Sequence, residues 1–197
     1  MSEFNLGPNG AQIVASDLII ENAELIKSAI EMYEDYYVIF DTPGQIELFS
    51  FRPSSPLIVD ILSEGQAMIA FVADSIIEST PSGFISQKLL YGSIMSRFFK
   101  PSMFLLNKTD LITDEELQKI ESWENSTDAL NEDFMNEKQA LNKQYFLSIL
   151  SAFKESGLMT KIHKISSKNM TGLEDVYADM SLYFTGGEDY DTLYKDE

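Results

Sequence analysis

Four polar segments of this 197-residue sequence contain residue types that bind phosphates, divalent cations or nucleobases in proteins. Three of them directly follow short apolar runs, and they are Asp41–Gln45 (D-T-P-G-Q), Asn107–Asp110 (N-K-T-D) and Ser166–Lys168 (S-S-K). The fourth segment, Gly7–Gly10 (G-P-N-G), lies near the first residue. Each segment also has a purely structural interpretation, and their order and spacing decide between the two.

The segment Asn107–Asp110 has the residue types needed to recognise guanine. The Asp110 carboxylate can accept hydrogen bonds from both N1–H and the exocyclic N2–H of guanine. Adenine lacks this pair of donors, so an adenine nucleotide would leave the carboxylate desolvated and unpaired. The stem of Lys108 can lie along the base, and Asn107 can connect neighbouring loops. The alternative is a polar turn that caps the next helix, with Asp110 in solvent.

The segment Asp41–Gln45 has the D-x-x-G form of a switch that senses the terminal phosphate of a nucleoside triphosphate. Asp41 can hold Mg²⁺ through a water, the Gly44 N–H can contact the γ-phosphate, and Gln45 can orient the attacking water. The alternative is a Pro-Gly type II turn that leaves a strand.

The other two segments are weaker signals when each is taken alone. The backbone of Ser166–Lys168 can contact the guanine O6, but serine and lysine are common in loops. The sequence of Gly7–Gly10 is typical of a turn, because proline sets φ and both asparagine and glycine tolerate the left-handed region. The order of D-x-x-G, N-K-x-D and S-S-K, each after its own apolar run, favours one nucleotide site over three unrelated turns.

An alternation of apolar runs and helical periods positions these segments. The runs that predict strands are Tyr36–Phe40, Ala67–Val72, Met103–Leu106 and Ile162–Ile165. The middle two are almost purely apolar, which predicts strands buried on both faces. Helices are predicted over residues 23–33, 84–98, 114–122 (behind Thr113), 137–155 and 172–184. The alternation predicts an α/β fold with a parallel sheet flanked by helices, and such sheets bind ligands where their strands end.

Composition narrows the class of protein. Hydrophobic residues make up 44% of the chain, enough for one compact domain over residues 1–185, with a helical acidic insertion at about 111–138 and an acidic flexible tail at 186–197. The net charge of −18 disfavours nucleic acid and membrane surfaces as partners. The chain has no cysteine and one histidine, His163, so thiolate and multi-histidine metal sites are excluded. We expect a cytoplasmic protein.

The four segments together resemble the GPN-loop GTPases, and the resemblance extends over nearly the whole chain, including the run Asp41–Phe49. It implies a P-loop GTPase-like, three-layer fold that binds GTP or GDP with Mg²⁺ and hydrolyses GTP at a homodimer interface, as a conformational switch or assembly factor. The implied roles are phosphate contact in trans for Gly7, Pro8 and Asn9, Mg²⁺ binding for Asp41, γ-phosphate and water contact for Gly44 and Gln45, and guanine binding for Asn107, Lys108, Asp110, Ser167 and Lys168.

The sequence departs from this family in one respect, because no G-x-x-x-x-G-K-[ST] loop occurs in it. That loop cradles the phosphates in P-loop GTPases. We therefore expect a chain that lacks the first strand or strands and the P-loop, with Met1 as an internal methionine, and with impaired hydrolysis. The alternative is a nucleotide-blind scaffold or interaction protein derived from the family. A protein effector, by analogy with RNA polymerase assembly, is implied by eukaryotic members of the family alone.

Overall fold

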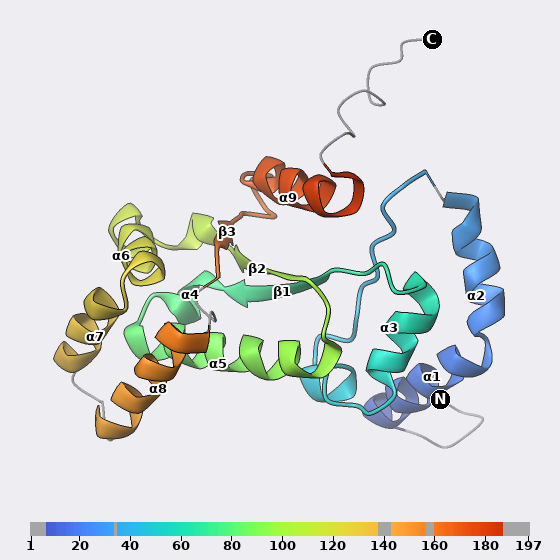
Figure 1. Cartoon of the computed structure of the whole chain (residues 1–197), viewed down its shortest axis with the longest axis horizontal. Coiled ribbons are helices and arrows are strands. Elements are labelled where there is room, and N and C mark those ends of the chain that lie inside the picture. The colour runs from blue at the N-terminus through green and yellow to red at the C-terminus, as the bar shows by residue number, and fades with distance from the viewer. Residues whose placement is uncertain (1–6, 34, 138–142, 157–159, 187–197) are drawn as a thin grey trace, which may run out of the picture. The chain divides into compact units, whose positions relative to one another are not determined.

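The computed structural model describes residues 7–33, 35–137, 143–156 and 160–186 (Figure 1). Of the tail predicted at 186–197, residues 187–197 lie outside the described residues. The chain divides into two compact units, and each is described by itself. The first comprises Met1–Ala67 and Ile94–Lys100, and the second comprises Met68–Ser93 and Pro101–Glu197.

The second unit contains a parallel sheet of three strands in the order β1-β2-β3. The strands are β1 (Ile69–Asp74), β2 (Ser102–Asn107) and β3 (Ile162–Lys164). The register pairs Asp74 with Asn107 and Leu106 with Lys164. The carboxyl ends of the three strands therefore lie at one edge of the sheet, which confirms that the sheet brings the polar segments following them together.

Helices cover both faces of this sheet and make three layers. On one face, α5 (Pro81–Phe98) places the ring of Tyr91 5.3 Å from that of Phe104 on β2. On the other, α9 (Leu173–Thr185) packs against a cluster that includes Met103 and Leu105. Figure 1 shows the two helices on opposite sides of the strands. The predicted α/β fold with a parallel sheet flanked by helices is confirmed.

The prediction that two strands are buried on both faces is right for β2 and wrong for β1. The four central residues of β2 are all buried, whereas Val72 on β1 is 58% exposed. The reason is position in the sheet. In the described residues β1 is an edge strand, and the cluster beneath α9 contains side chains of β2 but not Val72.

The predicted acidic insertion is helical. After η3 (Thr109–Leu111), the segment at about 111–138 forms α6 (Asp114–Asn125) and α7 (Thr127–Asn136). The Thr113 hydroxyl accepts a hydrogen bond from the N–H of Glu116, and the Glu116 carboxylate accepts one from the N–H of Thr113, so α6 begins in a capping box. Trp123 is buried, donates from Nε1 to the Asp133 carboxylate at 2.7 Å and meets the ring of Phe84 edge-on. These contacts fix the two helices against α5.

Two further helices complete the second unit. A short helix, α4 (Ser75–Glu78), follows β1 directly, and α8 (Lys143–Ser156) precedes β3. Of the helix predicted over 137–155, the part from Lys143 onward is present, whereas Glu137 is extended at the end of α7 and residues 138–142 are outside the described part of the chain. Within the described residues, no helix combines the length and apolar character needed to cross a bilayer.

The first unit is helical in its described residues. Its elements are α1 (Pro8–Glu21), α2 (Ala23–Ile30), η1 (Glu31–Tyr33), η2 (Ile46–Leu48) and α3 (Ser55–Ser63). The last turn of α5 belongs to this unit, where the Arg97 guanidinium donates to the backbone carbonyls of Ser50 and Phe51 at 2.9 and 3.1 Å. Lys100 forms an ion pair with Asp60 at 2.6 Å.

The strand predicted over Tyr36–Phe40 is wrong for this structure. Residues 37–43 have no regular secondary structure, and Ile39 is 85% exposed. The apolar run gave the prediction, but a strand also needs a neighbour to pair its backbone N–H and C=O groups. The sheet of the described residues has three strands and does not include this segment.

Candidate functional site

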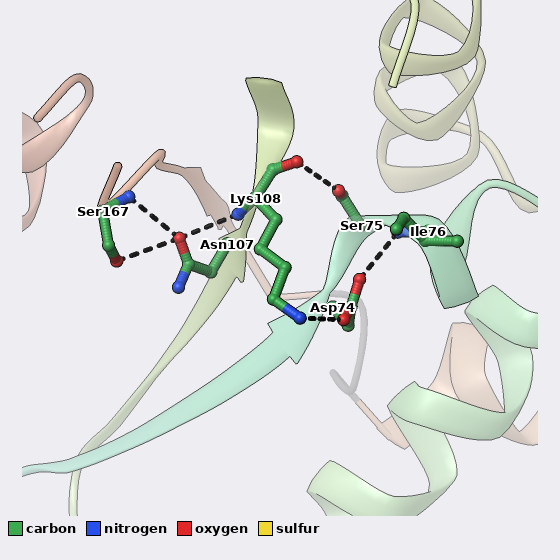
Figure 2. Close-up of polar contacts among 6 residues, drawn as sticks. All are labelled: Asp74, Ser75, Ile76, Asn107, Lys108 and Ser167. Carbon is green, nitrogen blue, oxygen red and sulfur yellow. Dashed lines mark hydrogen bonds and ion pairs between the residues drawn. The ribbon is translucent and has the colours of Figure 1, made fainter. Parts of the chain in front are cut away.

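Three polar loops meet at the carboxyl ends of the strands in the second unit. We call them the strand-end cluster, and its residues are Asp74–Ser75, Asn107–Asp110 and Ser166–Lys168. Figure 2 shows the part formed by Asp74, Ser75, Asn107, Lys108 and Ser167. The Asn107 side chain connects two of the loops. Its Oδ1 accepts hydrogen bonds from the Ser167 N–H and hydroxyl, both at 3.0 Å, and from the Lys108 N–H at 2.8 Å. The prediction that Asn107 connects neighbouring loops is thus confirmed by geometry.

Asp110 lies in the same cluster, and one of its carboxylate oxygens is held by a hydrogen bond. Its Oδ1 accepts a hydrogen bond from the Ser166 hydroxyl at 2.6 Å, and Lys168 Nζ lies 3.9 Å from its Oδ2. The Asp110 side chain is 9% exposed. Thr109 anchors the loop from behind, because its N–H and its hydroxyl both donate to the Ile165 carbonyl, at 3.2 and 3.0 Å. The solvated-turn interpretation of Asp110 is therefore wrong, and the carboxylate is fixed rather than free in solvent.

Lys108 adopts the left-handed backbone region, with φ 65° and ψ 32°. Few residues other than glycine, asparagine and aspartate adopt this conformation without support. Support comes from the end of β1, where the Ser75 hydroxyl donates to the Lys108 carbonyl at 2.8 Å and the Asp74 carboxylate pairs with Lys108 Nζ at 2.6 Å (Figure 2). The Lys108 ammonium holds the pKa of Asp74 below its ordinary value, and partial burial opposes this shift.

The remaining predicted site residues belong to the first unit. Gly7 is the N-cap of α1 and Pro8 is at the start of that helix, so G-P-N-G forms a first helical turn rather than the turn that the sequence alone favours. Asp41, Gly44 and Gln45 are exposed and lie between the irregular segment and η2. Gly44 is not among the residues with positive φ, so the proposed type II turn is excluded.

The structure describes no ready-made metal site. Within the described residues, no three His, Cys, Asp or Glu side chains are grouped so that they could hold an ion. Magnesium in nucleotide sites needs few protein ligands, because phosphates and waters supply the rest. The exposed carboxylate of Asp41 fits that limited role.

Sequence reasoning missed the roles of three residues in the cluster. Asp74, Ser75 and Ser166 each make a hydrogen bond to the N-K-x-D loop or to one of its side chains. The polar character of the β1 end was visible in the sequence. What was missing was the register, which places Asp74 beside Asn107.

Comparisons with known proteins agree with this arrangement. A family model described as a conserved hypothetical ATP binding protein matches residues 1–183. GPN-loop GTPase 3 of Dictyostelium discoideum is 33% identical over 151 residues, which cover 73% of this chain and 53% of that protein. GPN-loop GTPase 1 of Saccharomyces cerevisiae is 27% identical over 206 residues, which cover 100% of this chain and 53% of that protein. The chain belongs to the GPN-loop GTPase family.

A crystal structure of a GTPase in apo form from Pyrococcus abyssi has the same fold. Its TM-score is 0.76 at 22% identity, and the alignment covers 93% of this chain and 74% of that one. The chain spans about half the length of the relatives named above. The family model's description names ATP, whereas the relatives are named GTPases, so the choice of base rests on the chemistry of Asp110.

Proposed function

We propose that the strand-end cluster binds the guanine base of GTP or GDP. The observation that carries this proposal is the carboxylate of Asp110, which the Ser166 hydroxyl holds at 2.6 Å in a loop already fixed to Ser167 through Asn107. A fixed acceptor can select guanine, because its N1–H and N2–H donors fit one carboxylate and adenine leaves that carboxylate unpaired. Lys108 and Lys168 add positive charge beside the base in a chain of net charge −18.

We further propose that the whole protein is a GTP hydrolase that works as a homodimer and acts as a conformational switch or assembly factor. The names of its relatives support GTP hydrolysis. The homodimer and the role as a switch or assembly factor rest on the resemblance of the G-P-N-G segment to the family. Asp41 is the carboxylate that would hold Mg²⁺, which neutralises charge on the phosphates when bound. Gly44 and Gln45 would contact the γ-phosphate and the attacking water, while Gly7, Pro8 and Asn9 would act on the partner's phosphates.

A base-exchange experiment tests the guanine assignment. The chain is titrated calorimetrically with GDP, IDP, XDP and ADP, since inosine lacks the N2 amine and xanthine replaces it with a carbonyl. We expect GDP to bind most tightly and ADP most weakly. The substitution Asp110→Asn replaces one acceptor with a donor, so it should weaken GDP binding by roughly 10- to 100-fold and improve XDP binding, as expected for loss of a charge-assisted pair.

The matched control is Asp179→Asn, which also removes one carboxylate charge. Asp179 pairs with Lys161 at 2.9 Å beside the beginning of β3, away from the strand-end cluster. Its effect on GDP binding should be small. Equal GDP and ADP binding by the wild-type chain, or an unchanged preference in Asp110→Asn, would contradict the guanine assignment. A chain that binds none of the four nucleotides would contradict the guanine assignment as well.

A further inference from the structure

Two residues at the end of β1, Asp74 and Ser75, contact Lys108 of the N-K-x-D loop. Lys108 is one of four non-glycine residues with positive φ in the described chain. Such a conformation is sterically disfavoured for an ordinary L-residue, so it persists where neighbouring groups impose it. The Lys108 carbonyl accepts from two donors, the Leu111 N–H at 2.9 Å inside the loop and the Ser75 hydroxyl at 2.8 Å from outside it.

Ser75 is well placed to hold that carbonyl. It is fully buried at the first position of α4, directly after β1, and its partner is 33 residues away in sequence. Because β1 and β2 are paired in parallel through Asp74 and Asn107, the hydroxyl approaches from a rigid strand end. The bond therefore ties the N-K-x-D loop to the start of α4, directly after the last residue of β1.

Asp74 makes a second, distinct contact with the same residue. One of its carboxylate oxygens accepts from the Ile76 N–H at 3.0 Å and caps α4, while the other pairs with Lys108 Nζ at 2.6 Å. The pair is partly exposed, with side-chain exposures of 27% for Asp74 and 52% for Lys108, so it should be weaker than the buried bond from Ser75 and should weaken with salt.

We propose that Ser75 and Asp74 are positioning residues for guanine recognition. They hold Lys108 in its left-handed conformation and so set the direction in which Asp110 leaves the loop. This inference rests on the proposed guanine site, and it assigns to the end of β1 a share of the affinity for the base. Ser75 contributes the larger share through the backbone, and Asp74 contributes the smaller one through the Lys108 side chain.

The first test measures Lys108 without any ligand. Its ¹³Cα and ¹³Cβ chemical shifts report backbone conformation and are recorded in the wild-type chain, Ser75→Ala and Ser79→Ala. Ser79, the C-cap of α4, is the matched control, because its hydroxyl also donates to a carbonyl, but to that of Ile76 in the adjoining helix at 2.8 Å. Ser75→Ala should move the Lys108 shifts away from left-handed values, and Ser79→Ala should leave them in place.

The second test measures GDP affinity in the same variants by calorimetry. Ser75→Ala should weaken GDP binding about fivefold, the loss expected for one hydrogen bond, with the melting temperature used to exclude unfolding. Asp74→Asn keeps the cap on α4 and removes the ion pair, so its effect should be about twofold and should vanish at high salt. Asp179→Asn serves as the matched charge control.

A double-mutant cycle separates positioning from general packing. Glycine adopts the left-handed region without strain, so a loop with Lys108→Gly needs no support from Ser75. The effect of Ser75→Ala on GDP affinity should therefore shrink to less than about twofold in the Lys108→Gly background. Equal effects of Ser75→Ala in both backgrounds, or Lys108 shifts unchanged by Ser75→Ala, would overturn the proposal.

The two tests also separate this inference from the proposed function. A wild-type chain that binds no GDP, combined with Lys108 shifts that respond to Ser75→Ala, would overturn the guanine site while supporting the structural role of Ser75. Normal GDP binding that is insensitive to Ser75→Ala would overturn the positioning role and leave the guanine site intact.

Discussion

At the scale of single residues, two buried ionisable side chains stand out from the rest of the second unit. Glu78 and Lys88 are both fully buried. Lys88 Nζ donates to the Thr160 carbonyl at 3.3 Å and lies 4.0 Å from the centroid of the Phe104 ring. Neither carboxyl oxygen of Glu78 has a hydrogen-bond partner among the described residues. Burial raises the pKa of Glu78 to about 8, opposed by Lys88 and reinforced by Glu124, and burial lowers the pKa of Lys88 to about 8.

This pair predicts an unusual dependence of stability on pH. Between pH 4.5 and about 8 the folded chain retains a proton on Glu78 that the unfolded chain has released, so the free energy of unfolding should fall as the pH rises through this window. Glu78→Gln removes this contribution. Its free energy of unfolding relative to wild type should therefore rise with pH, by at most about 1.4 kcal/mol per pH unit. Urea denaturation at several pH values between 5 and 8 measures the difference.

A suitable control for that series is Glu115→Gln, which changes an exposed glutamate on α6. Its difference from wild type should stay nearly constant over the same pH range. A flat difference for Glu78→Gln as well would show that the Glu78 carboxyl is already ionised in the folded chain and would contradict the prediction.

At the scale of elements, the start of α6 was readable from the sequence because its signal is local. Thr113, followed by Glu116 three residues later, is the pattern of a capping box, and the helix begins where it predicts. Thr113→Ala should lower the free energy of unfolding by about 1 kcal/mol, because the N–H of Glu116 loses its acceptor. Thr113→Ser keeps the hydroxyl and should remain close to wild type in the same urea series. Similar losses in both variants would place the effect in the threonine methyl group.

The predictions that were wrong or missing depend on contacts between residues distant in sequence. Tyr36–Phe40 has the composition of a strand. Whether a strand forms depends on pairing with a neighbouring strand, and the residues near this segment in sequence do not reveal that neighbour. The exposure of Val72 was missed for a similar reason, because the order of strands in the sheet, which places β1 at an edge, is not visible in the sequence. In the site, Asn107 and Ser167 were predicted from motif order. Ser75 was not, since its role depends on a hydrogen bond across 33 residues.

At the scale of the whole molecule, the proposed homodimer must form despite the charge of its protomers. Each chain has a net charge of −18, so association brings like charges together. We expect dimerisation in the presence of GTP to strengthen as sodium chloride rises from about 50 to about 300 mM, because salt screens this repulsion. Sedimentation velocity gives the mass, and the monomer is 22.3 kDa. A chain that stays monomeric with GTP at every salt concentration would contradict the homodimer and the action of Asn9 in trans.

The packing of α6 and α7 buries a tryptophan whose intrinsic fluorescence can report on these helices. Trp123 is the single tryptophan of the sequence, and it is buried between these helices with its indole N–H bonded to Asp133. Its fluorescence should therefore shift to longer wavelength when the helices separate in denaturant. The emission spectrum therefore reports whether α6 and α7, here called the rim helices, remain packed. No described contact joins Trp123 to the loops at the strand ends, so a change of intensity on adding nucleotide would show that occupation of those loops is transmitted to the rim helices.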